Sequence, residues 1–185
     1  MSNKKIRVLV PLANGFEEIE AITPIDIFRR AGWEVVVAGV GGTELEGAHG
    51  IKVCSDTLIE EVGTDFDAIV LPGGGLGSKN LAESWAVNEK MLLIANSGGL
   101  LAAICAAPAV VLGPAGLLEG RKAVCFPGVE DYVPNFEFSD ERVCVDGNLI
   151  TARAAGCAVE FALAIVEKLG SKQLSDEIAK AILFE

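Results

Sequence analysis

The strongest constraint on the fold of this chain lies in the stretch 101–109, LAAICAAPA, where four apolar residues lead into a cysteine, small residues and a proline. An uninterrupted apolar run of this length is typical of a strand that is buried on both faces. Residues 106–112 are predicted to begin a helix, with Pro108 early enough that its missing N–H costs little. Cys105 is therefore predicted to stand where a buried strand turns sharply into a helix.

This placement gives Cys105 two alternative roles. Free cysteine is among the most buried residue types, so one interpretation is a structural core residue. The other is a nucleophile, because a sharp strand-to-helix turn lifts one side chain clear of the sheet and toward unpaired backbone N–H groups. Those N–H groups and the helix dipole favour an anion, which would lower the pKa of the thiol.

Strands and helices are predicted to alternate along the whole chain. The expected strands are 6–11, 34–39, 51–54, 67–71, 101–104, 122–126 and 149–152, and the expected helices are 16–31, 84–96, 106–112, 156–169 and 175–183, with a further helical segment around Leu81. Thr23, Pro24 and Asp26 predict that the first helix restarts after a kink. This alternation indicates one domain over residues 1–185, a doubly wound α/β sandwich with a mainly parallel sheet.

Composition narrows the functional classes. The formal charge of −11 argues against a nucleic-acid partner, because such binding needs Lys and Arg to release counterions. No apolar run approaches the roughly 18 residues of a membrane-spanning helix, and the first residues do not resemble a secretory signal. The five cysteines lack metal-ligand spacing and accompany a single histidine, so we expect reduced thiols, no metal, no cofactor and a cytoplasmic location.

Ligands of doubly wound sheets bind beyond the carboxyl ends of the strands. Three such ends carry unusual residues here, namely segment 15–20, the glycine-rich loop 72–77 and Cys105. Loop 72–77 lacks the position and spacing of a dinucleotide fingerprint. Its backbone at Gly73 and Gly74 suits close approach to another group, and its amides could stabilise an oxyanion over the cysteine. A plain turn is the alternative.

Glu20 is the most informative acidic residue of segment 15–20. Glu17 and Glu18 fall in the first turn of the predicted helix, where carboxylates favour the dipole, and solvation explains them. Glu20 shares a helical face with apolar residues that should pack on the sheet, so its carboxyl is predicted to be partly buried with a raised pKa. A protonated Glu20 could donate a hydrogen bond to the sulfur of Cys105. The alternative is an ordinary glutamate at a helix boundary.

Several motifs resemble those of one protein family. They are Gly15-x-Glu17-Glu18-x-Glu20, Leu71-Pro72-Gly73-Gly74 and Ala102-Ala103-Ile104-Cys105-Ala106-Ala107-Pro108, supported by residues 29–32, 150–153 and 160–167. Together they make the chain similar, from Ile6 to about Leu169, to the ThiJ/PfpI superfamily, in particular the subgroup of the Parkinson's-disease-associated protein deglycase.

The resemblance implies a flavodoxin-like sandwich that usually forms a homodimer. It also implies that Cys105 is the reactive, oxidation-sensitive residue and that Glu20 is its carboxyl partner. Backbone amides of Gly74 and Ala106 would form an anion pocket, with Gly73 beside them.

The implied dimer interface includes Cys54, which matches a family cysteine near that interface, together with Arg29 and Arg30. Ile22 and Ile25 on the first predicted helix are plausible apolar contacts there.

Two positions depart from the family pattern. Phe126 precedes a proline where some members have a histidine, so a Cys–His pair is missing and the protease activity of the PfpI branch loses its base. His49 stands where relatives can carry an arginine beside the pocket. Both residues are expected as pocket neighbours, without a catalytic role for His49.

Three functions follow from these residues and the resemblance. The first is a cofactor-independent enzyme that acts on 2-oxoaldehydes such as methylglyoxal, or on their early glycation adducts, through a Cys105 hemithioacetal with Glu20 as acid and base. The second is a redox sensor or redox-regulated chaperone in which Cys105 is oxidised to sulfinate without turnover. The third is a role in thiamine-precursor metabolism, which the family name suggests and no phosphate-binding sequence supports.

Selectivity among the thiols is also predicted. The other cysteines, Cys54, Cys125, Cys144 and Cys157, lie in or beside apolar segments, where burial raises the pKa of a thiol. Cys105 alone combines a sharp turn, a helix start and a glycine-rich neighbour, and is expected to react first.

Overall fold

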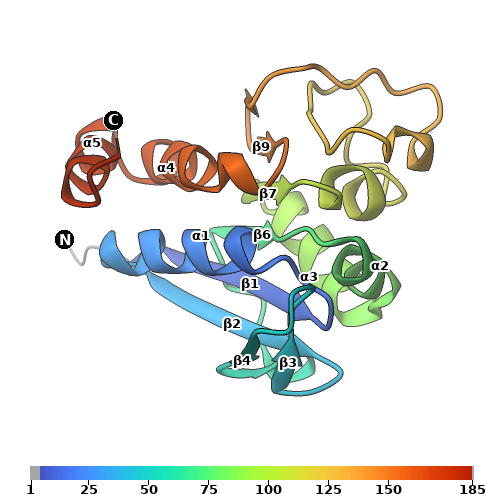
Figure 1. Cartoon of the computed structure of the whole chain (residues 1–185), viewed down its shortest axis with the longest axis horizontal. Coiled ribbons are helices and arrows are strands. Elements are labelled where there is room, and N and C mark those ends of the chain that lie inside the picture. The colour runs from blue at the N-terminus through green and yellow to red at the C-terminus, as the bar shows by residue number, and fades with distance from the viewer. Residues whose placement is uncertain (1–4, 185) are drawn as a thin grey trace.

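Seven strands form the central sheet of the structure, a computed structural model that describes residues 5–184. They are β1 (Arg7–Ala13), β2 (Glu34–Val40), β5 (Thr57–Leu58), β6 (Ala68–Leu71), β7 (Leu100–Ile104), β8 (Val143–Asp146) and β9 (Leu149–Ala152). Their spatial order is β5-β2-β1-β6-β7-β9-β8, and every neighbouring pair is parallel except β8 and β9. A separate antiparallel hairpin consists of β3 (Glu44–Glu46) and β4 (Lys52–Cys54) (Figure 1).

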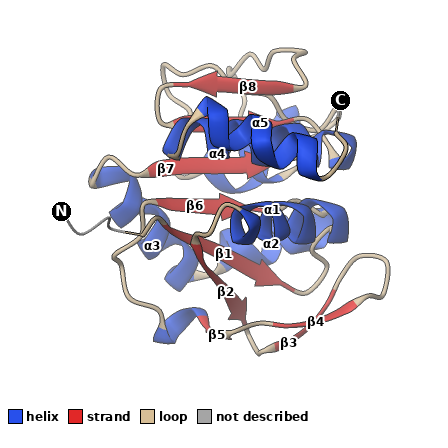
Figure 2. Cartoon of the chain, turned by 90° about the vertical axis from the view of Figure 1, so that its left-hand side faces the viewer, coloured by secondary structure: helices blue, strands red, loops and turns tan. Residues whose placement is uncertain are grey.

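Helices cover both faces of this sheet. They are α1 (Glu18–Arg30), α2 (Gly75–Glu83), α3 (Trp85–Asn96), α4 (Ala158–Leu169) and α5 (Lys172–Ala181). Figure 2 views the sheet with α1, α4 and α5 in front, and these three helices share one apolar core with it, whereas α2 and α3 pack into a second core on the other face. The doubly wound, mainly parallel α/β sandwich expected from the sequence is thus confirmed.

Strand β1 shows how the sequence assigns side chains to the two cores. Val8, Val10 and Leu12 belong to the core under α1 and α4, while Leu9 and Ala13 belong to the core under α2 and α3. All five are buried. Side chains alternate across a strand, so a strand covered on both faces must be apolar at consecutive positions, which is what made it recognisable in the sequence.

The first helix differs from its prediction at Pro24. Instead of restarting there, α1 runs without a break from Glu18 to Arg30 with Pro24 inside it. Its buried face, which includes Ala21, Ile25 and Phe28, continues across the proline. Burial of that continuous face against the sheet and α4 offsets the one backbone hydrogen bond that Pro24 cannot make.

The segment 122–126 was predicted as a strand and is not one. It runs beside the sheet and is held by individual bonds instead of a ladder: the N–H of Val124 donates to Oγ1 of Thr151 at 2.9 Å, and that of Phe126 donates to the carbonyl of Cys105 at 2.7 Å. The side chains of Ala123, Val124 and Cys125 are nevertheless buried. An apolar pattern reports this burial but does not show whether the backbone pairs with a strand.

Other boundaries also differ from the prediction. The strands β3, β5 and β8 were not predicted, because they are short and two of them carry exposed residues. Helix α2 begins at Gly75 and contains Gly77, which are poor helix formers. The helix predicted over 106–112 is a turn followed by a short π-helical segment, Pro108–Leu112.

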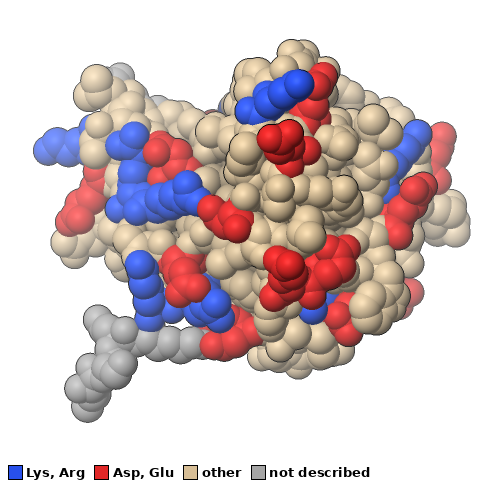
Figure 3. Space-filling model, turned by 90° about the horizontal axis from the view of Figure 1, so that it is seen from below, with Lys and Arg blue, Asp and Glu red and all other residues tan. Residues whose placement is uncertain are grey.

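The surface is charged with both signs. Figure 3 shows groups of Asp and Glu over the middle of one face, with Lys and Arg more prominent toward the left-hand side of the view. The excess of acidic residues accounts for the net charge of −11. Among residues 5–184, no helix is both long enough and apolar enough to cross a bilayer.

Candidate active site

Cys105 follows β7 directly and has a left-handed backbone conformation, with φ of 63°. This conformation is uncommon for a residue other than glycine and costs about 1–3 kcal/mol. Two hydrogen bonds hold it in place: the N–H of Cys105 donates to the carbonyl of Ala152 at 2.8 Å, and its own carbonyl accepts from Phe126 at 2.7 Å. The predicted sharp turn after the buried strand is therefore present.

The sheet order brings the three predicted strand ends together. Strand β6 lies between β1 and β7, so the loop after β6 is flanked by the start of α1 and by Cys105. The N–H of Glu17 donates to the carbonyl of Gly73 at 3.1 Å, and the N–H of Gly73 donates to Oε2 of Glu20 at 3.0 Å. Gly77 also donates, to the carbonyl of Gly15 at 3.1 Å.

Gly73 lies against both the carboxyl of Glu20 and the side chain of Cys105. A Cβ atom at position 73 would overlap Oε2 of Glu20 and the Cβ of Cys105. Only glycine therefore leaves room for the two side chains to meet beside this backbone unit. Gly74, with φ of 92°, follows and turns the chain into α2.

Glu20 is fully buried, as its place on the inner face of α1 predicted, although the burial is complete instead of partial. Oε1 of Glu20 has no hydrogen-bond partner among the described protein groups, apart from the facing thiol. Burial raises the pKa of Glu20 to about 7; the Glu17 carboxylate also raises this pKa, while hydrogen bonds from Cys105 and Gly73 lower it. The expected raised pKa of Glu20 thus agrees with the structure.

The thiol of Cys105 does not ionise as easily as the sequence suggested. Burial and, next in size, the Glu20 carboxylate raise the pKa of Cys105 to about 12, although hydrogen bonds from the backbone N–H groups of Gly74 and Ala106 lower it. The expected amide donors are in place, but burial and the facing negative charge outweigh them. Because the Glu20 carboxylate raises the pKa of the thiol, the pair retains one proton after it has lost the first.

Glu18 corrects a second expectation. It is buried instead of solvated, with only 6% of its surface exposed. Its Oε1 accepts from the backbone N–H of His49 at 2.7 Å, and its Oε2 lies 2.8 Å from Nδ1 of His49. Burial acts to raise the pKa of Glu18, but the hydrogen bonds from His49 outweigh it and lower that pKa to about 2. The hydrogen bond and the charge of Glu18 in turn raise the pKa of His49, whose ring is largely exposed.

Glu17 caps helix α1, although its position in the sequence predicts only a solvated carboxylate. Its Oε2 accepts from the N–H of Glu20 at 2.8 Å, which caps the start of α1. Its Oε1 lies 4.0 Å from Nδ1 of His49, so donor atoms of Glu17, Glu18 and His49 fall within 4.8 Å of one another. These residue types also bind divalent cations. No local sequence pattern predicts this group, because His49 lies in the β3–β4 hairpin, 31 residues from Glu18.

The remaining predicted site residues divide into two groups. Phe126 is half exposed and is bound to Cys105 through its backbone, in agreement with its expected place beside the pocket. The residues expected at an interface lie elsewhere: Arg29 pairs with Asp56 at 3.4 Å, and Arg30 pairs with Asp26 at 2.6 Å. Arg29, Cys54, Ile22 and Ile25 line one shallow hollow of about 280 Å³.

The other cysteines are only partly as expected. Cys125, Cys144 and Cys157 are buried, and burial raises the pKa of Cys125 to about 12 and that of Cys144 to about 11. Cys54 is exposed, contrary to the expectation, because β4 belongs to the small hairpin and not to the central sheet. Exposure therefore does not distinguish Cys105 from Cys54. Its reactivity depends on the backbone N–H groups that surround its sulfur.

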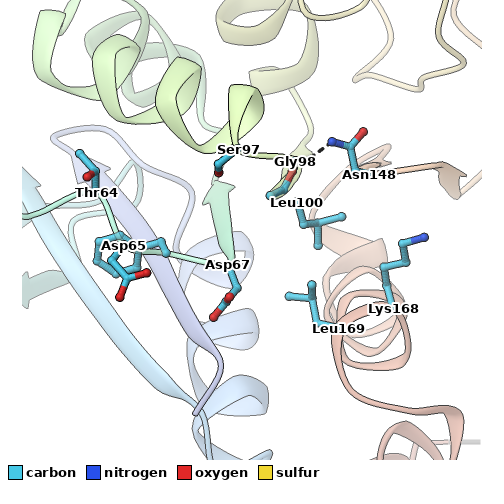
Figure 4. A pocket seen from close by; sticks show the side chains of 11 residues that line it. Thr64, Asp65, Asp67, Ser97, Gly98, Leu100, Asn148, Lys168 and Leu169 are labelled. Atoms are coloured by element: carbon cyan, nitrogen blue, oxygen red, sulfur yellow. Dashed lines mark hydrogen bonds between the residues drawn. The ribbon is translucent and has the colours of Figure 1, made fainter. Parts of the chain in front are cut away.

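A cavity of about 650 Å³ lies at the opposite edge of the sheet (Figure 4). It is lined by residues that precede β6 and β7 and by the end of α4, including Asp67, Ser97, Asn148 and Lys168. Asn148 donates to the carbonyl of Gly99 there at 3.1 Å. Because β6 and β7 begin at this edge and Cys105 follows the other end of β7, the cavity is separate from the thiol.

The buried Glu18 carboxylate gives a pH-dependent contribution to stability. Its folded-state pKa of about 2 lies below the ordinary value of 4.5, so its ionised form stabilises the fold above about pH 4.5, and this stabilisation is lost as the pH falls toward 2. We expect Glu18→Gln to lower the free energy of unfolding by about 1.5–3 kcal/mol at pH 6. Denaturant titrations from pH 6 to pH 2 should show this difference shrinking to zero.

The matched control is Glu46→Gln, since Glu46 is exposed and lies 3.8 Å from Lys52. An exposed pair of this kind contributes about 0–1 kcal/mol. Equal stability of Glu18→Gln and the unmodified protein at pH 6 would contradict a structural role for the Glu18–His49 pair.

Coupling between Glu20 and Cys105 can be measured from the absorbance of the thiolate. Glu20→Gln removes the negative charge and keeps an N–H donor, whereas Glu20→Leu removes both. A hydrogen bond to a charged group is worth about 1.5–3 kcal/mol, or about one to two pKa units. We therefore expect the thiol pKa to be lower by that amount in Glu20→Gln than in Glu20→Leu. Coincident curves for the two variants would show that Glu20 does not contact the sulfur in solution.

Comparison with known proteins places this geometry in a family. A model of the DJ-1/PfpI family matches residues 6–168. The chain is 38% identical over 185 residues to the Parkinson disease protein 7 homolog of Danio rerio, covering 97% of both chains. It is 32% identical over 184 residues to the glutathione-independent glyoxalase DJR-1.2 of Caenorhabditis elegans, covering 98% of this chain and 97% of the relative.

A solved structure, Toxoplasma gondii DJ-1 in an oxidised form, superposes with a TM-score of 0.93 at 41% identity over 97% of this chain and 98% of that one. The chain spans less than half the length of two DJ-1 homologues of Arabidopsis thaliana, with 46% and 41% of those proteins covered. The fold, the motifs around Glu20 and Cys105 and these matches agree, and the chain belongs to the DJ-1/PfpI family.

Proposed function

We propose that the protein is a cofactor-independent enzyme of carbonyl-stress defence, which converts methylglyoxal-type 2-oxoaldehydes, free or as early glycation adducts, into 2-hydroxy acids. The observation that carries this proposal is the pair of Glu20 and Cys105 beside Gly73, a partly exposed nucleophile next to a buried proton carrier. The C. elegans relative named a glutathione-independent glyoxalase supports the same reaction class.

The reaction follows from the two protonation states of the pair. In the reactive state the proton lies on Glu20, and the thiolate accepts hydrogen bonds from the N–H groups of Gly74 and Ala106. The thiolate adds to the aldehyde carbon, and Glu20 gives its proton to the oxygen, which forms a hemithioacetal. The Glu20 carboxylate then removes the proton on that carbon and returns it to the neighbouring carbon, while the hydroxyl proton passes to the neighbouring oxygen, which yields a thioester of the hydroxy acid. Water hydrolyses the thioester and regenerates the thiol.

A pKa of about 7 suits this proton transfer. General acid–base catalysis is most efficient when the pKa of the group lies near the working pH. Complete burial raises the pKa of Glu20 into this range. The same burial keeps solvent from exchanging the proton while it moves between the two carbons of the substrate.

Lactate formation from methylglyoxal tests the proposal. We expect the unmodified protein to produce lactate, Cys105→Ser to produce none, and Glu20→Gln to lose turnover by at least about a hundredfold, because a positioned acid or base contributes about 10²–10⁴-fold. Glu20→Gln should still form the hemithioacetal, which mass spectrometry detects. Equal and negligible lactate from the unmodified protein and Cys105→Ser would refute the enzymatic function.

A redox role of the same thiol is the second candidate. The amide donors of Gly74 and Ala106, together with a protonated Glu20, would also stabilise the oxygens of a Cys105 sulfinate formed by two successive oxidations with peroxide. In this case Cys105 acts as a sensor, or as the switch of a redox-regulated chaperone, and no substrate is turned over. We propose a reducing compartment such as the cytoplasm for either role, since all five cysteines are free.

We further propose a homodimer through the hollow beside α1 and β4. This surface combines the apolar Ile22 and Ile25 with the exposed Cys54 and Arg29. Light scattering at micromolar concentration should therefore give the mass of a dimer. Ile22→Glu should shift the protein toward the monomer, whereas Leu92→Glu, at a similarly exposed position on α3, should not. A monomeric unmodified protein would contradict this assembly.

A further inference from the structure

In the described part of the chain, the charged side chains that act on the Glu20–Cys105 pair are negative. Within residues 5–184, the only charged side chain outside the pair that shifts the pKa of either member is the carboxylate of Glu17. The other interacting groups are neutral backbone N–H groups. The segments that surround the pair, 12–20, 72–78, 105–118 and 126–129, contain no Lys, Arg or His.

Two basic side chains of neighbouring segments already have acidic partners. His49 is paired with Glu18 at 2.8 Å and lies 4.0 Å from Glu17. Arg153, one residue beyond β9, pairs with Asp140, at 3.5 Å between charged groups and at 3.0 Å to its carbonyl. These partners weaken the attraction of either side chain for an anionic group of a substrate.

The local balance of charge is therefore negative. Glu17, Glu18 and the Glu20–Cys105 pair each carry one negative charge once the pair has lost a proton. A protonated His49 offsets one of these charges, and at higher pH it offsets none. The backbone groups of Gly73, Gly74 and Ala106 around the thiol carry no net charge and do not balance this cluster. A substrate that reaches Cys105 therefore enters a negative electrostatic potential.

We infer that the site selects carbonyl compounds by charge and accepts neutral or cationic ones while it disfavours anionic ones. This inference rests on the proposed function for its substrates: it favours uncharged 2-oxoaldehydes and adducts carried by basic peptides over phosphorylated aldehydes and adducts carried by nucleotides. Two unit charges about 7 Å apart in a water-like medium change a rate by two- to threefold, and more where burial lowers the dielectric constant. A preference of at least about tenfold for a cation over an anion is expected at low salt.

Charged methanethiosulfonates test the field without any turnover. The Cys105 thiolate displaces methanesulfinate from such a reagent and forms a mixed disulfide, whatever the biological reaction is. The trimethylammonium-ethyl and sulfonatoethyl reagents differ mainly in charge, and dividing each rate by that for 2-mercaptoethanol removes their intrinsic difference. Peptide mapping follows Cys105 and the exposed Cys54 in the same sample.

We expect the normalised rate at Cys105 to be at least tenfold higher for the cationic reagent in 10 mM salt and to approach equality in 1 M salt. Glu17→Gln should reduce the preference about four- to ninefold, because one charge changes the two rates two- to threefold in opposite directions. Gln keeps a side-chain oxygen that can cap α1 but carries no charge. Glu177→Gln on α5 removes one charge far from the site and should leave the ratio unchanged. Equal normalised rates in low salt, or a preference for the anionic reagent, would overturn the inference.

Substrate kinetics extend the test to the proposed reaction. The pair is 3-hydroxy-2-oxopropanal and its phosphate ester, which share the reacting carbons. We expect kcat/KM to be at least tenfold lower for the phosphate, and this ratio to shrink in high salt. Equal values or a preference for the phosphate would overturn the charge selection even where lactate formation from methylglyoxal holds. Absence of turnover with both, beside a clear preference in the labelling, would refute the proposed function and leave the charged field established.

Discussion

The candidate site depends on the contact between a buried carboxyl, that of Glu20, and a partly buried thiol, that of Cys105, which meet beside one glycine. Glu20 and Cys105 do not ionise independently. Burial raises the pKa of both groups, the Glu20 carboxylate also raises that of the thiol, and the hydrogen bond from Cys105 lowers that of Glu20. The N–H of Gly73 favours a charge on the carboxylate, and those of Gly74 and Ala106 favour a charge on the sulfur. The position of a single proton between these groups therefore decides whether the protein presents a nucleophile or a base.

Other parts of the structure fix the positions of Glu20 and Cys105. The sheet order places β6 between β1 and β7, which aligns the three strand ends. Glu17 caps α1 and so fixes the first turn that carries Glu20. Glu18 uses its buried carboxylate to fasten the tip of the β3–β4 hairpin to the same turn. The hairpin lies outside the central sheet, and two backbone bonds also hold it to the loop after β1: the N–H of Gly15 donates to the carbonyl of Glu46, and that of Ala48 donates to the carbonyl of Phe16, both at 2.8 Å.

How far the sequence predicted this arrangement depends on the range of each interaction. Consecutive buried residues marked β1 and β7, and the turn residues after them marked Cys105, because these signals lie within a few positions of one another. The burial of Glu20 could be predicted from the helical period of α1. The burial of Glu18 could not, because its partner His49 is 31 residues away and belongs to an unpredicted hairpin. Likewise, the apolar pattern at 122–126 reported burial but not that Val124 bonds to a side chain of Thr151 instead of a strand. The resemblance to a family indicated roles for Cys105 and Glu20, while the protonation of the pair depends on distances that no pattern contains.

Gly73 also limits how the site can diverge. Any side chain at this position would occupy the space that Glu20 and Cys105 share, so the centre of the pocket cannot be reshaped by substitution there. Variation that preserves the chemistry is restricted to the outer positions, such as Glu17, His49 and Phe126, whose side chains are partly or largely exposed. New substrate preferences would therefore arise by substitution at these outer positions. The position of Gly73 itself tolerates almost no change.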